Sequence, residues 1–124
     1  MNPTYGLLTI VLLLHFVGDF VLQTRWMAEN KSRSFTALTV HVLTYGATLW
    51  VGLVVAQRPL LDVTYYAGSN FAIHFAVDAV TSRITTYWWK KQNLYAFFTT
   101  IGFDQFLHAV TLLWTARMLL DSTP

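Results

Sequence analysis

Four long apolar stretches alternate with short polar segments along the chain. Each stretch approaches the roughly 20 residues that a helix needs to cross a bilayer. The third is the least apolar, because Gly68, Ser69 and Asn70 lie near its start. The pattern predicts an all-α fold, a four-transmembrane-helix bundle forming a single integral membrane domain over residues 1–124, with helices at about 5–22, 35–56, 65–87 and 94–120.

Lysine and arginine gather at one end of these predicted helices. Six of the eight flank the first and third connectors: Arg25, Lys31, Arg33, Arg83, Lys90 and Lys91. Only Arg58 and Arg117 lie at the other end. Since cytoplasmic connectors are enriched in these residues, both termini are predicted to be non-cytoplasmic.

The composition agrees with a membrane protein. Hydrophobic residues make up 55% of the chain and charged residues 11%, whereas soluble domains carry about 25% charge. A soluble bundle with these stretches as its core is the alternative. The net charge of +2 is small and dispersed, which argues against nucleic-acid binding. The chain has no cysteine, so a metal would be held by nitrogen and oxygen.

A repeated motif divides the chain into two similar halves. Residues 15–25 read HFVGDFVLQTR and residues 74–83 read HFAVDAVTSR. A shorter echo links HVLT at position 41 with HAVT at position 108. The repeat predicts two similar helical hairpins, inserted with the same orientation and related by an axis along the membrane normal.

Histidine and aspartate recur within the apolar stretches. Each stretch holds one histidine, and three of the four histidines have an aspartate four residues away, on the same helix face. Given the predicted helix directions, each aspartate lies on the cytoplasmic side of its histidine. We therefore expect one cluster, with imidazoles nearer the middle of the bilayer and carboxylates nearer the cytoplasm. Its members are His15, Asp19, His41, His74, Asp78, Asp104 and His108.

Three interpretations of this cluster stay open from the residues alone. The side chains can hydrogen-bond between helices as structural links. They can relay protons or ions. They can also hold one or two divalent ions, since imidazole and carboxylate ligands suit Zn, Mn or Fe. In a metal-dependent hydrolase, an aspartate that is not a ligand would act as the base, with Asp19, Asp78 and Asp104 as candidates.

Polar residues beside the cluster are candidates for supporting roles. Gln23 and Gln105 can orient ligands through hydrogen bonds. Arg25 and Arg83 lie just cytoplasmic of the carboxylates and can bind a substrate phosphate. The segment around Trp26 is predicted to lie in the membrane interface, with Lys31 reaching a lipid headgroup.

The segments HFVGDFVLQTRWMAENK, His41, HFAVD at position 74 and FDQFLH at position 103 together resemble a known family. It comprises small polytopic proteins of bacteria and their phages, the domain of unknown function 3307. The resemblance implies a bacterial inner-membrane protein, phage-encoded in some cases, with no established activity. The His and Asp pattern is also similar to that of small membrane-bound metal-dependent hydrolases, which would imply a lipid or lipid-linked substrate. The rival expectations are a non-enzymatic phage membrane protein, acting as a homo-oligomer in superinfection exclusion or lysis, and a proton or ion transporter.

Overall fold

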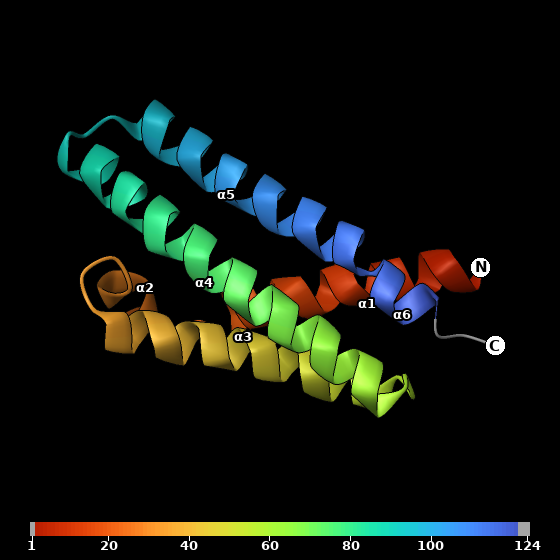
Figure 1. The fold of residues 1–124 in the computed structure, drawn as a ribbon. Helices are drawn as coiled ribbons and strands as arrows, with labels where there is room; N and C mark the ends of the chain where they lie inside the picture. The colour runs from red at the N-terminus through yellow and green to blue at the C-terminus, as the bar shows by residue number, and fades with distance from the viewer. Residues whose placement is uncertain (1, 122–124) are drawn as a thin grey trace.

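The protein is an all-helical bundle in a computed structural model that describes residues 2–121 (Figure 1). No strand occurs in this part of the chain. The elements in chain order are α1 (Pro3–Phe16), a π-helical turn η1 (Val17–Val21), α2 (Arg25–Asn30), α3 (Phe35–Val55), α4 (Leu60–Lys90), α5 (Leu94–Thr115) and α6 (Arg117–Leu120). The predicted all-α class is confirmed.

Helix starts coincide with polar residues that cap exposed amide groups. The side chains of four residues accept hydrogen bonds from amides in the first turns of α1, α2, α3 and α5: Asn2, Thr24, Ser34 and Asn93. Beyond the ends of α3 and α4, Gln57 and Gln92 adopt positive φ angles of 59° and 56°, which stop the helical path. The connectors are therefore short and sharply defined.

The four long helices pack as a closed bundle. α3 contacts α1 and α4, α4 contacts α5, and α1 contacts α5. In Figure 1 the turn between α3 and α4 and the turn between α4 and α5 lie at opposite ends of the molecule. The buried apolar core fills the end that includes the start of α1 and the end of α5, with Leu7, Leu53 and Leu112 among its members. The polar cluster lies on the other side of this core.

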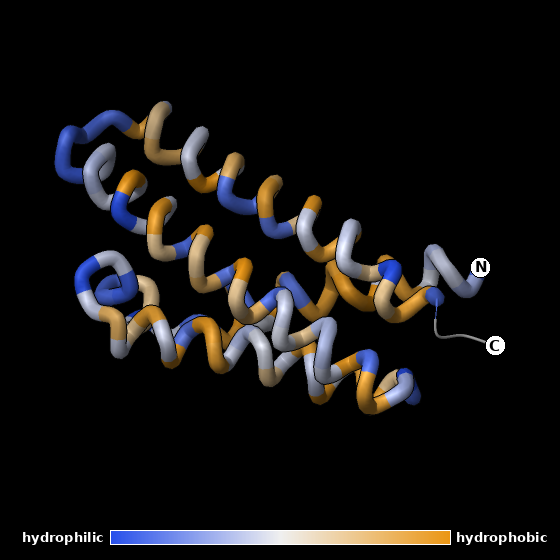
Figure 2. Tube along the Cα trace, viewed as in Figure 1, coloured by the Kyte–Doolittle hydropathy of each residue, from blue (hydrophilic) through white to orange (hydrophobic). Residues whose placement is uncertain are grey.

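Among residues 2–121, three helices are long and apolar enough to cross a membrane: Pro3–Val21, Phe35–Val55 and Leu94–Leu120. Figure 2 shows hydrophobic residues along the helices and hydrophilic residues gathered in the turn between α4 and α5 and around α2. Large apolar side chains such as Phe16, Val51 and Phe106 are exposed on the outside of the bundle. This outward apolar surface fits membrane association.

α4 differs from its sequence-based prediction. The predicted span of about 65–87 is extended at both ends, to Leu60–Lys90, and α4 is not among the helices apolar enough to cross a membrane. The reason is that its buried face is polar, with Asn70, His74, Asp78 and Ser82 turned into the bundle. These inward groups lower the mean hydropathy of the helix, although the helix is long enough to span.

Candidate metal centre

Asp19 lies in the π-helical turn that follows α1, and this turn places its side chain in the bundle interior. The amide of Leu22 donates to the carbonyl of Val17 at 2.9 Å, five residues back, which marks the wider turn. Gly18 lets this turn approach α3 closely, because an added Cβ would lie 3.2 Å from both Thr48 Cβ and Tyr45 Cδ2. Such π-helical turns are frequent at functional sites.

A Gly18→Ala substitution is expected to destabilise the protein by about 1–3 kcal/mol, because the methyl group overpacks the contact between η1 and α3. Thermal unfolding followed by tryptophan fluorescence measures the effect. The matched control is Gly68→Ala, since a Cβ at Gly68 meets nothing within 4 Å. Equal unfolding temperatures for the two variants would contradict the role assigned to Gly18.

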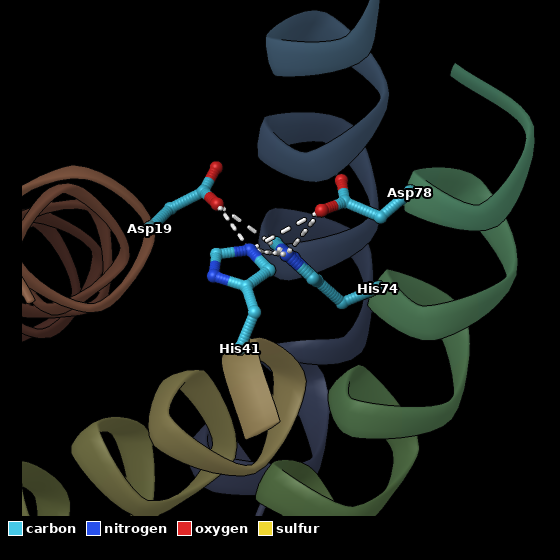
Figure 3. Close-up of side chains that lie close together, drawn as sticks. All are labelled: Asp19, His41, His74 and Asp78. Atoms are coloured by element: carbon cyan, nitrogen blue, oxygen red, sulfur yellow. Dashed lines mark hydrogen bonds and ion pairs between the residues drawn. The ribbon is translucent and has the colours of Figure 1, made fainter. Parts of the chain in front are cut away.

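Four buried side chains from three elements converge on one point (Figure 3): Asp19 of η1, His41 of α3, and His74 and Asp78 of α4. The Nε2 atom of His41 lies 3.1 Å from Asp19 Oδ1 and 3.2 Å from Asp78 Oδ2. The Nε2 atom of His74 lies 3.4 Å and 3.5 Å from the same two oxygens. The two Nε2 atoms are 3.2 Å apart. We call these four residues the quartet.

The quartet distances are close to those around a tetrahedral metal ion. Zinc bonds to nitrogen and oxygen measure about 2.0–2.2 Å, so neighbouring ligand atoms of a tetrahedron are roughly 3.3–3.6 Å apart. Five of the six distances in the quartet measure 3.1–3.5 Å: two lie within the tetrahedral range, at 3.4 and 3.5 Å, and three lie slightly below it, at 3.1–3.2 Å. The side chains present therefore fit an ion with two nitrogen and two oxygen ligands.

A second group adjoins the quartet and shares Asp19 with it. Asp19, Asp104 and His108 each offer a ligand atom, all within 4.8 Å of one another. The Nε2 atom of His108 lies 3.2 Å from Asp104 Oδ1 and 3.1 Å from Asp78 Oδ1. Six of the seven residues predicted to be ligands thus belong to one of the two groups.

His15 is the exception, because both of its ring nitrogens contact other partners. Nε2 lies 2.8 Å from Gln105 Oε1 and Nδ1 lies 3.1 Å from the Tyr45 hydroxyl. Its distance to Asp19 Oδ2 is 3.9 Å, longer than a hydrogen bond. Within the described residues, His15 joins neither candidate metal group. Its ring nitrogens contact Gln105 and Tyr45, so the ligand role of His15 stays a prediction without support from the geometry.

Gln105 lies where the sequence places a ligand-orienting residue. Its Nε2 donates to Asp19 Oδ2 and to Asp104 Oδ2, each at 3.0 Å. Because carboxylates only accept, these two bonds set the orientation of the amide, with Oε1 left for His15. Gln23 faces the cavity described below, and its buried Oε1 has no hydrogen-bond partner among the described residues.

The sequence-based prediction of the site does not include Lys31 or Tyr45. Lys31 donates to Asp78 Oδ2 at 2.9 Å instead of reaching outward to a headgroup. Tyr45 stacks on His74 with ring centroids 4.0 Å apart, and His74 stacks on His108 at the same distance. Tyr45 lies four residues after His41 and therefore on the same helix face, so its place near the cluster was predictable from the sequence. No local pattern marks Lys31.

A cavity of about 900 Å³ opens from this cluster toward α2 and the turn between α4 and α5. The three aspartates of the cluster, Asp19, Asp78 and Asp104, line this cavity, whereas none of the four histidines does. The carboxylates therefore lie nearer α2 and the turn between α4 and α5 than the imidazoles do, at the end that the sequence predicts to face the cytoplasm. The Asp104 side chain is 13% exposed, more than those of Asp19 and Asp78 at 4% and 1%.

Three exposed cations, Arg33, Arg83 and Lys90, line the outer part of the cavity. Arg83 lines the cavity with the carboxylates, and its guanidinium group lies over the Phe35 ring, 5.4 Å from the centroid, so phosphate binding by Arg83 stays a prediction. Arg25 does not line the cavity; its exposed side chain pairs at 2.6 Å with Glu29, which does line it.

Comparison with known proteins agrees with the resemblance noted in the sequence. Neither a curated protein nor a solved structure matches the chain. One family model, described as protein of unknown function DUF3307, matches residues 7–123. Because this match covers most of the chain, the protein belongs to the DUF3307 family.

Proposed function

We propose that this protein is a bacterial inner-membrane metalloprotein that binds a divalent ion in the quartet and hydrolyses the anionic headgroup of a lipid or lipid-linked substrate. The observation that carries the proposal is the convergence of two imidazoles and two carboxylates at tetrahedral distances inside an apolar bundle. Structural links between helices would not require two nitrogens and two oxygens to meet at one point.

The net charge of the cluster also supports metal binding. The cluster contains three carboxylates, and one ammonium group, that of Lys31, pairs with it through Asp78. Two negative charges therefore remain when the imidazoles are neutral. Buried charge of this size is costly unless it is compensated. A divalent ion compensates it. With nitrogen and oxygen ligands, the candidates are Zn, Mn and Fe, and the tetrahedral spacing favours Zn.

The cavity fits an anionic amphiphile. Its floor is the aspartate cluster, its outer part carries Arg33, Arg83 and Lys90, and aromatic side chains such as Trp89 and Phe97 lie along its wall. Arginine binds phosphate through paired hydrogen bonds. A bound ion lowers the pKa of water so that hydroxide forms near neutral pH. Asp104 is the carboxylate outside the quartet, and it faces the substrate side.

We assign the bundle a four-span topology with both termini outside the cytoplasm. α4 packs between α3 and α5, each of which is apolar enough to span, so it crosses with them. The end of the bundle with α2 and the turn between α4 and α5 carries six cations: Arg25, Lys31, Arg33, Arg83, Lys90 and Lys91. Because cytoplasmic connectors are enriched in lysine and arginine, we place this end at the cytoplasm. The cavity then opens toward the cytoplasmic leaflet.

A proton or ion path is less well supported than metal binding. The cluster continues on its other side into a buried apolar core that includes Val11, Leu49, Val63 and Leu112. A conducting path needs polar groups or water throughout the membrane. This core therefore closes the bundle on the side away from the cavity.

The test is phosphate release from vesicles that contain phosphatidic acid or a polyprenyl pyrophosphate. Protein loaded with Zn²⁺ is expected to release inorganic phosphate, and both chelation and His74→Ala are expected to abolish the release. Release that persists in His74→Ala, or its absence with both lipids, would overturn the hydrolase assignment. A phage-related phenotype that survives in His74→Ala and Asp78→Ala would favour a non-enzymatic membrane protein instead.

A further inference from the structure

The two oxygens of Asp78 point to different partners. Oδ2 contacts the quartet nitrogens and Lys31, whereas Oδ1 lies 3.1 Å from His108 Nε2. Asp19 likewise belongs both to the quartet and to the group with Asp104 and His108. Two carboxylates thus connect two adjacent sets of ligand atoms. Shared carboxylates of this kind are found between the ions of two-metal centres.

The second set of ligand atoms is ordered by its neighbours. Thr81 Oγ1 donates to Asp104 Oδ1 at 2.6 Å, and Gln105 donates to Asp104 Oδ2 at 3.0 Å. The His108 ring is stacked on His74, with centroids 4.0 Å apart and planes 17° apart. A neutral Nε2–H of His108 cannot form two full hydrogen bonds, yet carboxylate oxygens of Asp78 and Asp104 lie 3.1 and 3.2 Å from it. A cation among these atoms satisfies all of them.

We propose that Asp78, Asp104, His108 and Asp19 hold a second divalent ion, beside the quartet ion and on the cavity side of it. This inference rests on the proposed function, because it assumes an ion in the quartet. The quartet histidines are buried and do not line the cavity. Asp104 lines the cavity and is partly exposed, so the second ion keeps coordination positions open toward it.

The charges predict that this second ion binds together with an anion. One divalent ion already balances the three aspartates and Lys31. A second ion leaves two positive charges, next to a cavity that also carries Arg33, Arg83 and Lys90 against the single outer carboxylate of Glu29. Phosphate, as a free ion or as a phosphomonoester headgroup, supplies the compensating charge. The second ion and phosphate should therefore each raise the affinity of the other.

Manganese titration of the purified full chain in detergent, followed by electron paramagnetic resonance, tests this inference. The first equivalent of Mn²⁺ is expected to bind without phosphate. The second is expected to bind about 5–150-fold more tightly when phosphate is present. Its spectrum should show magnetic coupling, since paired ions lie roughly 3.5–4 Å apart. Parallel titrations with inorganic phosphate and with phosphatidic acid in vesicles distinguish a free ion from a lipid headgroup.

Two variants separate the second ion from the first. Asp104→Asn is expected to bind one Mn²⁺ and to lose the coupled signal. Asp62→Asn, at the start of α4 and away from the cluster, should bind both ions as the wild type does. Two bound ions in Asp104→Asn would overturn the inference, as would a second ion that is indifferent to phosphate. A single bound ion in the wild type refutes the second site and leaves the quartet standing, whereas no bound ion refutes both.

Discussion

A His41→Ala variant is expected to lose the tightly bound metal that the wild type retains. His41 contributes the nitrogen closest to both quartet carboxylates, at 3.1 and 3.2 Å. Loss of a residue that merely orients a ligand costs about 10–100-fold in metal affinity, so loss of this ligand should cost more than roughly 100-fold. Elemental analysis after dialysis, and competition titration with a coloured chelator, measure the change.

His15→Ala is the matched control for this experiment. It also removes a buried imidazole, from a helix apolar enough to cross a membrane, but His15 contacts Gln105 and Tyr45 and joins neither ligand group. It should retain one equivalent of metal, with an affinity reduced by about 10–100-fold as for an orienting residue. Equal metal content in His41→Ala and His15→Ala would contradict the quartet as the binding site. Both variants must first migrate as monodisperse protein in detergent.

A Lys31→Met variant is expected to make the stability of the protein depend more strongly on metal. Without an ion, Lys31 is the cation closest to the buried Asp78 carboxylate, at 2.9 Å. Its removal from the metal-free protein should lower the free energy of unfolding by about 1.5–3 kcal/mol, the size of a hydrogen bond to a charged group. In the metal-loaded protein the ion still compensates Asp78, so the loss should be smaller. Unfolding temperatures with metal and with chelator, for both proteins, give the coupling.

The control for Lys31 is Lys91→Met, which removes an exposed lysine in the turn after α4. This variant should unfold at nearly the wild-type temperature in both metal states, because exposed charges contribute little. If Lys31→Met lowers the unfolding temperature equally with and without metal, Lys31 is a structural partner of Asp78 that does not respond to the ion. The Lys31 contact would then be unrelated to metal binding.

Much of the helical framework was predictable from local sequence. The apolar stretches at 5–22 and 35–56 correspond closely to Pro3–Val21 and Phe35–Val55. The stretch at 94–120 is divided into α5 and the short α6. α4 was predicted too short, because mean hydropathy depends on composition and does not register which face of a helix is buried. Its polar residues face inward, where other helices supply partners.

The one-turn spacing of His and Asp predicted a common cluster, and six of the seven residues lie in the two ligand groups. That spacing assigns a side chain to a helix face but does not set the direction of its ring. His15 turns to Tyr45 of α3 and Gln105 of α5, which are distant in sequence. Lys31 enters from a connector whose path depends on how α2 packs against α3.

By itself, the sequence determined an all-helical, apolar chain with one histidine in each long stretch, because hydropathy and helical periodicity are properties of neighbouring residues. It also placed the carboxylates nearer the first and third connectors than the imidazoles, since rise per residue converts position into depth. Only the tertiary structure decided which atoms meet. The quartet joins η1, α3 and α4, and distances of 3.1–3.5 Å between its atoms arise from helix packing that no local pattern encodes.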